Sequence, residues 1–237
     1  MQSVKIKNVV VCGFSPALRG MRNAMESWPK SDSEYGTGYD DFPYWYGKEE
    51  LCPFDGPCDV PETPRIGPND MALAKKLIRT GSGSERKFLR MIQVWMDITL
   101  PRCVWLELDT YKIATVKNSC STMYRLGSRD LTVADFADNV IDEYTLNMLN
   151  GLATSMRAAK GKERVELLRA IKLRLPEGYL QKATLSMNYE TLLRLYFERR
   201  NHRMVEWGGP GGICDWVRGL PYMKDFISAA EKENKSE

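Results

Sequence analysis

The sequence predicts an α+β fold, with helices packed on a small, mostly antiparallel sheet, and three observations carry this prediction. Residues 91–99 alternate apolar and polar side chains with the period of two that is typical of a strand. Segments 70–79 and 189–203 repeat apolar residues at the three- and four-residue spacing of a helix. Strands and helices do not alternate regularly along the chain, so a parallel α/β sheet is not indicated.

The composition bounds the class of protein. A chain of 237 residues, 43% of them hydrophobic, is long enough for one sizeable core, and we expect one main domain over residues 1–237. The net charge is only +3 and the basic residues are spread along the chain, so no nucleic-acid partner is expected. The sequence contains no apolar run of about 18 residues and no signal core, which predicts a cytoplasmic protein without membrane contact. The six cysteines lack a framework spacing and are expected to be reduced thiols.

The amino-terminal part begins with a predicted strand over residues 4–12, which Gly13 ends. Residues 31–68 then form an irregular, aromatic-rich insertion without either period. Two interpretations of its aromatics remain open, local packing or a lid over a ligand. These side chains are Tyr35, Tyr39, Phe42, Tyr44, Trp45 and Tyr46.

The middle of the chain alternates short elements. Asn69 or Asp70 is expected to cap a helix over residues 70–79. The strand over residues 91–99 is followed by a stop at Pro101 and a short helix within 101–112. A polar stretch over residues 114–123 is predicted to be a loop.

The carboxy-terminal half is predicted to be mainly helical. Thr132 and Asp135 have the spacing of a helix start, which predicts a helix over residues 133–158. Further helices are expected over 162–173, over 189–203 and, after the glycine-rich stretch 208–212, over 214–218, followed by a frayed charged tail.

Metal chemistry is not expected. His202 is the single histidine, which excludes sites that need two or more imidazoles. Cys52 and Cys58 are spaced more widely than a zinc knuckle, and no second close cysteine pair accompanies them.

Two regions are candidates for binding an anion. The turn over residues 81–84, followed by Glu85, Arg86 and Lys87, offers backbone amides and cations to a phosphate or a flavin diphosphate; the alternative is a plain turn. The region 172–207 gathers groups that suit a nucleotide, and the alternative there is a solvated helix face. Its polar members are Lys172, Arg174, Asn188, Arg194, Arg199, Arg200, His202 and Arg203.

One ordered pattern resembles a known family. Leu175-Pro176 is followed by Asn188, Leu192-Leu193, Arg199 and Glu206 at the spacing found in the carboxy-terminal signature of flavin-dependent thymidylate synthases. A weaker similarity runs over residues 85–123, and together the two cover about half of the chain. The resemblance implies the fold of that family, the ThyX fold.

The resemblance also implies site residues. Arg199 matches the arginine that pairs with the deoxyuridylate base and orients it, and it is the expected catalytic residue. Lys172 stands at the place of a phosphate-binding arginine, Asn188 matches an asparagine that contacts the flavin or the nucleotide, and His202 lies near a flavin-contacting histidine. The other expected cofactor contacts are Ser84, Glu85, Arg86, Lys112 and Arg194, and the other expected substrate contacts are Thr115, Ser119 and Ser121.

The sequence departs from the family at its hallmark. Thr110-Tyr111-Lys112 replaces an Arg-His-Arg triplet, and Glu190 occupies a position where an arginine is usual. Several segments are similar instead to an uncharacterised branch common in phages and firmicutes. They are Gly20-Met21-Arg22-Asn23, Ser27-Trp28, Lys30-Ser31-Asp32-Ser33, Asp109-Thr110-Tyr111-Lys112 and Asn118-Ser119-Cys120-Ser121-Thr122-Met123.

The implied activity is the transfer of one carbon from methylenetetrahydrofolate to C5 of a pyrimidine deoxynucleotide such as dUMP, with hydride from reduced FAD and NADPH as co-substrate. Such sites are built between subunits of a homotetramer, and the cofactor carries the difficult chemistry. The alternative is a catalytically silent protein that keeps the fold and binds a nucleotide or a protein partner. A nucleic-acid-binding role for the basic helix ranks behind both.

Overall fold

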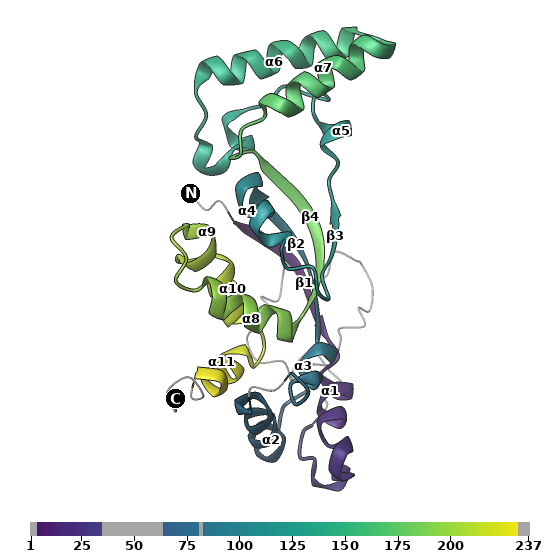
Figure 1. Cartoon of the computed structure of the whole chain (residues 1–237), viewed down its shortest axis with the longest axis vertical. Helices are drawn as coiled ribbons and strands as arrows, with labels where there is room; N and C mark the ends of the chain where they lie inside the picture. The colour runs from purple at the N-terminus through teal and green to yellow at the C-terminus, as the bar shows by residue number, and fades with distance from the viewer. Residues whose placement is uncertain (1–3, 35–63, 81–82, 232–237) are drawn as a thin grey trace. The chain divides into compact units, whose positions relative to one another are not determined.

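A computed structural model describes residues 4–34, 64–80 and 83–231 (Figure 1). Four strands form one sheet in the order β1-β2-β4-β3. They are β1 (Lys5–Cys12), β2 (Gln93–Pro101), β3 (Val116–Ser119) and β4 (Leu180–Asn188). The aromatic side chains of the predicted insertion, residues 35–46, lie outside the described residues.

The central pair of strands is antiparallel. The amide of Tyr189 donates to the carbonyl of Ile92 at 3.0 Å, and the amide of Arg102 donates to the carbonyl of Tyr179 at 3.1 Å. Residue numbers therefore rise along β2 as they fall along β4, the pattern of an antiparallel ladder. Together with the helices that pack around it, this sheet confirms the predicted α+β class.

Strand β2 has the alternation that the sequence predicts. Ile92, Val94, Met96 and Ile98 are at most 2% exposed, whereas Trp95 is 39% exposed. The predicted bounds are shifted, because residue 91 ends helix α3 (Lys87–Met91) and the strand continues to Pro101. A period of two thus identified the buried face of the strand but not its ends.

The described chain divides into two compact units, and each of the four strands contributes residues to both. Unit 1 comprises Met1–Ile6, Asp97–Tyr111 and Lys117–Thr184, and unit 2 comprises Lys7–Met96, Lys112–Val116 and Leu185–Glu237. That the whole chain is a single domain stays a prediction. None of the helices in the described ranges has the length and apolar character of a membrane span.

Unit 1 is built around two paired helices, α6 (Glu143–Ala158) and α7 (Gly161–Arg174), which lie side by side in Figure 1. Their facing side chains form a core with Phe136 and Leu126, both at most 1% exposed. The unit also contains α4 (Arg102–Leu108) and α5 (Thr122–Arg125).

The predicted helix over residues 133–158 is wrong in its first third. Thr132 and Asp135 do form a capping box, but it closes only a 3-10 turn, Val133–Asp135. Helix α6 starts ten residues later, where the Asp142 carboxylate accepts a hydrogen bond from the Thr145 amide at 2.8 Å. A capping signal marks a helical turn, and the residues after that turn decide how far the helix extends.

The predicted loop over residues 114–123 is also wrong in part. It contains strand β3 and the start of α5. β3 is short, polar and exposed or half-buried throughout, so it lacks the apolar alternation that reveals a strand. Its pairing with β4 decides its conformation, and the pairing continues past the strand, where the Cys120 amide donates to the carbonyl of Lys182 at 2.9 Å.

Unit 2 packs its helices around a group of aromatic rings. Phe14 and Tyr189 meet edge to face with ring centres 5.5 Å apart, and Phe226 lies 6.2 Å from Tyr189. These rings come from α1 (Phe14–Met21), α8 (Tyr189–Arg199) and α11 (Met223–Glu231). The other helices of the unit are α2 (Pro68–Arg79), α3, α9 (Val205–Gly208) and α10 (Ile213–Gly219).

Two predictions for the end of the chain are corrected. Helix α8 ends at Arg199, and residues 200–203 lie beyond it. The tail that was expected to be frayed contains α11, whose Phe226, Ile227 and Ala230 are buried and which packs on α2. Its apolar residues recur at helical spacing, a signal that the charged residues after Glu231 obscured.

A buried ion pair joins residues 22–33 to helix α2. The Asp70 side chain is fully buried and accepts from Arg22 at 2.6 Å, from Ser31 at 2.7 Å and from Ser33 at 2.6 Å. The prediction that Asp70 caps this helix is therefore wrong. The Asp32 carboxylate caps α2 instead, accepting from the amides of Asn69 at 2.8 Å and Asp70 at 3.0 Å.

The pKa of Asp70 reflects these contacts. Burial alone would raise it, but the hydrogen bonds from Ser33, Ser31 and Arg22 and the charge of Arg22 bring it below its ordinary value. A carboxyl whose pKa is lowered on folding stabilises the protein above its unfolded pKa of about 3.9. That contribution is lost as the pH falls toward the folded pKa.

We expect Asp70→Asn to lower the free energy of unfolding by about 3–5 kcal/mol at neutral pH, because it leaves the buried Arg22 charge unpaired. The variant also lacks the pH-dependent stability that ionised Asp70 provides. Its free energy of unfolding should therefore fall less than that of the wild type as the pH drops below 4. Chemical denaturation between pH 3 and 7 measures both effects. Glu34→Gln is the matched control, since its pair with Arg65 at 3.9 Å is largely exposed. Equal losses for the two variants would contradict the prediction.

Candidate functional site

A hollow in unit 1, with a volume of about 70 Å³, lies where the segment after β3 meets the start of β4. It combines hydroxyl groups, cations and one carboxylate. Its lining residues are Cys120, Ser121, Thr122, Arg125, Arg129, Leu131, Asp135, Tyr179, Leu180, Gln181 and Lys182.

The hydroxyl side of the hollow is formed by the turn that starts α5. Ser121 caps this short helix, and its Oγ accepts a hydrogen bond from the Met123 amide at 3.2 Å. An accepting hydroxyl keeps its own proton for donation. Ser121 is thus oriented by the backbone while it remains a hydrogen-bond donor to a ligand.

Three cations face one carboxylate around the hollow. Arg129 holds Asp135 through two hydrogen bonds, Nη1 to Oδ2 at 2.8 Å and Nη2 to Oδ1 at 2.5 Å. Arg125 and Lys182 are exposed, and neither side chain has a hydrogen bond or ion pair within the described part of the chain. The surplus of positive charge suits an anion.

Asp135 stays ionised in this setting. Burial raises its pKa, but the hydrogen bonds from Arg129 and from the Thr132 amide, with the charge of Arg129, bring the pKa below its ordinary value. The carboxylate therefore balances Arg129 and leaves the charges of Arg125 and Lys182 for a ligand.

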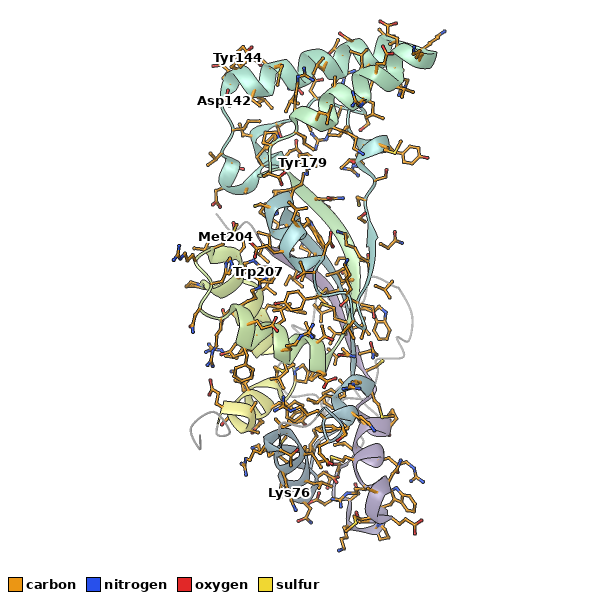
Figure 2. The ribbon with its side chains drawn as sticks, in the orientation of Figure 1. Lys76, Asp142, Tyr144, Tyr179, Met204 and Trp207 are labelled. Atoms are coloured by element: carbon orange, nitrogen blue, oxygen red, sulfur yellow. The ribbon has the colours of Figure 1, made fainter. Side chains whose placement is uncertain are left out.

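Tyr179 adds a neutral donor. Figure 2 labels it just before β4, and its ring packs edge to face on Phe136 with centres 5.9 Å apart. Burial, followed by the charge of Asp135, raises the pKa of Tyr179 above its ordinary value, so the side chain is a phenol at neutral pH. A phenol, a serine hydroxyl and two cations form a donor set that suits a phosphate monoester.

A second group of candidate residues belongs to helix α8 in unit 2. Asn188 is 4% exposed and caps the helix, with Oδ1 accepting from the Thr191 amide at 2.9 Å. Thr191 in turn donates to the carbonyl of Ile113 at 3.2 Å, which ties the helix to the segment that carries Lys112 and Thr115. The expectation that an asparagine opens this helix is confirmed, and its side chain has a structural task there.

Beyond the end of α8, cationic and aromatic side chains gather around Trp207. The Arg199 guanidinium lies 5.0 Å from the centre of the Trp207 ring, and the His202 ring meets it edge to face at 6.2 Å. Nδ1 of His202 accepts from the Met204 amide at 3.2 Å, so a neutral imidazole carries its proton on Nε2. Figure 2 labels Trp207 and Met204 in this region.

The turn before α3 has a structural role, because Arg86 at its end caps helix α2. Arg86 donates from Nε and Nη2 to the carbonyl of Ile78 at 3.0 and 2.7 Å, which caps the end of α2. Ser84 and Glu85 beside it are exposed. Arg90 on α3, which no sequence pattern singled out, pairs with Glu190 of α8.

The predicted site residues are divided between the two units, and few of them line the hollow. Of the expected substrate contacts in unit 1, Ser121 lines the hollow, whereas Ser119 and Lys172 are exposed outside its lining. Arg174 also belongs to unit 1, where its Nη1 donates to the carbonyl of Ala170 at 3.1 Å. The remaining predicted residues belong to unit 2, where Arg194 pairs with Glu198 at 3.7 Å. Tyr111, at the place of the family histidine, is buried at 3% exposure.

Sequence reasoning missed several lining residues of the hollow. Arg125 and Arg129 lie just after the polar segment 114–123, and two cations so close to its serines were the signal that could have identified them. Tyr179 and Lys182 carried no such signal, because their place depends on the pairing of β4. Within the described residues, no group of three or more His, Cys, Asp or Glu side chains is placed to hold a metal ion.

Comparisons with known proteins identify the fold. No family model and no curated protein matches the sequence. A crystal structure of thymidylate synthase X (ThyX) from Helicobacter pylori with FAD and dUMP matches with a TM-score of 0.56 at 15% identity, covering 96% of this chain and 100% of that one. A second structure of the flavin-dependent ThyX from the same organism, complexed with FAD and dUMP, matches at 0.53 and 14%, covering 93% and 97%. The chain therefore has the fold of the ThyX flavin-dependent thymidylate synthases.

Proposed function

We propose that the protein is a flavin-dependent enzyme of the thymidylate synthase type. It transfers one carbon from methylenetetrahydrofolate to C5 of a pyrimidine deoxynucleotide, dUMP or a close relative, and NADPH supplies the reducing equivalents. The observation that carries this proposal is the fold, which 96% of the chain shares with a structure that holds FAD and dUMP. We further propose a cytoplasmic homotetramer of the phage and firmicute branch.

The hollow of unit 1 supports a site for the nucleotide phosphate. Ser121 and Tyr179 supply neutral donors, while Arg125 and Lys182 supply charge that no described residue neutralises. A phosphate dianion takes both kinds of donor. The resemblance assigns Lys172 to a phosphate of the nucleotide and Arg199 to its base, and Thr115 and Ser119 are assigned to the nucleotide without a specific group.

The donor set of unit 2 fits a flavin dinucleotide. Lys112, Arg194 and Ser84 are exposed, and their cationic and hydroxyl groups suit a diphosphate and a ribose. Glu85, also exposed, is an acceptor that suits a ribose hydroxyl. The resemblance assigns Asn188 and His202 to the flavin, and the charge of Arg86 beside the turn is assigned to its phosphates. Bound FAD supplies hydride transfer, and the protein binds and orients the reactants.

Two observations favour the alternative, a silent nucleotide-binding protein. Tyr111 lies in the core at the place of the family imidazole, and two donor groups of Arg86 are used to cap α2. Such a protein would bind the nucleotide in the hollow without turnover. Flavin content separates the two proposals, because only the enzyme needs it.

We expect the purified protein to show the visible absorbance of an oxidised flavin and to release FAD in near-stoichiometric amount on denaturation. Absorbance spectra and mass spectrometry of the released ligand provide the measurement. A colourless protein that also fails to take up added FAD would exclude the enzyme and leave the silent nucleotide-binding protein.

We expect Arg125→Gln to weaken dUMP binding about tenfold or more, because a charge-assisted hydrogen bond to phosphate is lost. Deoxyuridine, which lacks the phosphate, is expected to bind both proteins with equal affinity. Isothermal titration of both ligands tests this. Arg169→Gln, an exposed arginine on α7 of the same unit, is the control and should change neither affinity. Equal loss for both ligands would contradict the phosphate assignment.

A further inference from the structure

Trp207 on α9 lies against two of the expected site residues, Arg199 and His202. The centre of its ring is 5.0 Å from the guanidinium carbon of Arg199, and the His202 ring meets it edge to face at 6.2 Å. Trp207 is fully buried, at 0% exposure, whereas Arg199 is half-buried. The indole therefore supports the Arg199 guanidinium from within the core of unit 2.

The glycine-rich stretch 208–212 explains how Trp207 comes so close to the end of α8. A Cβ at position 208 would lie 2.5 Å from the carbonyl oxygen of Arg200, so only glycine lets this segment pass the end of the helix. A Cβ at position 209 or 212 would lie 2.7 or 2.6 Å from the carbonyl oxygen of Val205, so these glycines let the stretch fold tightly onto α9. Residue 207 is thereby held beside Arg199 by the backbone as well as by the packing of its ring.

The backbone between the two residues is fixed by hydrogen bonds. Just past the end of α8, the Arg199 carbonyl accepts from the His202 amide at 2.9 Å, and the Met204 carbonyl accepts from the Trp207 amide at 3.1 Å. The Met204 amide in turn donates to Nδ1 of His202 at 3.2 Å. With the backbone fixed, the orientation of Arg199 depends on what its long side chain contacts.

An aromatic ring is suited to orienting such a side chain. Arginine has many rotamers, and a ligand that needs one of them must restrict the others when it binds. A ring face attracts a guanidinium, that of tryptophan most strongly, and the attraction is larger where water is excluded. A contact through the face of a guanidinium does not use its N–H groups, which lie in its plane and are the groups that bond to a base. A buried indole can thus orient the charge before the ligand arrives.

We propose that Trp207 is a positioning residue, whose ring orients Arg199 toward the base of the nucleotide. This inference rests on the proposed function, because Arg199 is assigned to the base there. It gives the glycine-rich stretch 208–212 a role in the site, since these glycines allow the ring to reach Arg199. It also requires that Trp207 affects the nucleotide only through Arg199.

The test is a double-mutant cycle on dUMP affinity, measured by isothermal titration of the protein as purified. We expect Trp207→Leu to weaken dUMP binding about tenfold, because a desolvated cation–π contact no longer restrains Arg199. Trp207→Phe keeps a ring face with a weaker attraction and is expected to lose only about threefold. In the Arg199→Gln background, Trp207→Leu should cause no further loss, because the residue through which it acts is gone. If Trp207→Leu does not fold, Trp207→Phe carries the same cycle.

Phe226→Leu is the matched control, because Phe226 is a buried aromatic residue of the same unit that packs against the ring of Tyr189. It should lower the temperature of thermal unfolding, as Trp207→Leu does, without a change in dUMP affinity. Unchanged affinity for Trp207→Leu, equal loss for Phe226→Leu or additive losses in the cycle would each show that Trp207 is not a positioning residue, while the proposed function stands. If the wild type binds no dUMP, the proposed function fails and this inference fails with it.

Discussion

The antiparallel pairing of β2 with β4 is the constraint on which the candidate groups depend. The amide of Arg102 donates to the carbonyl of Tyr179, and the amide of Tyr189 donates to the carbonyl of Ile92. This register decides which residue of β4 points to which face, and a slip by one residue would reverse every side chain. Tyr179 and Lys182 line the hollow in unit 1, and Asn188 caps α8 in unit 2, because the register is the one observed.

The arrangement of charges around the hollow suits the proposed enzyme, in which the protein binds and orients its ligands. Asp135 neutralises Arg129 and stays ionised, whereas Arg125 and Lys182 keep their charges for a ligand. Tyr179 remains a phenol and Cys214 remains a thiol, because burial raises the pKa of Cys214 to about 11. Loss of the Arg-His-Arg triplet is compatible with such an enzyme, since the cofactor carries the hydride chemistry.

Sequence patterns predicted the helices and strands that bury one face, because buried side chains then recur at regular spacing. Strand β2 and helices α2, α7 and α8 were found because one face of each is buried, and the fold class was inferred from them. Strand β3 could not be found, because it is polar and is stabilised by its partner strand. The start of α6 was misplaced because a capping box can close a single 3-10 turn. The tail was misjudged because its charged end obscured the apolar stripe of α11.

The candidate site was predicted less completely. Ser121 was expected and lines the hollow, but Arg125, Arg129, Tyr179 and Lys182 were not expected, because three segments distant in sequence meet there. Arg86 was expected to bind phosphate, which stays a prediction, and its contacts with the Ile78 carbonyl at the end of α2 were not expected. Arg90 and Glu190 form an ion pair although they are 100 residues apart in the sequence. Local pattern cannot reveal such long-range pairs.

The most direct test of the proposed activity is the fate of the hydrogen at C5 of the nucleotide. The protein would be incubated without oxygen with C5-deuterated dUMP, methylenetetrahydrofolate, FAD and NADPH, and the nucleotide then analysed by mass spectrometry. We predict a product that has lost the C5 deuterium and gained a methyl group. A nucleotide that keeps its deuterium and its mass, while FAD and dUMP are both bound, would contradict the proposed activity.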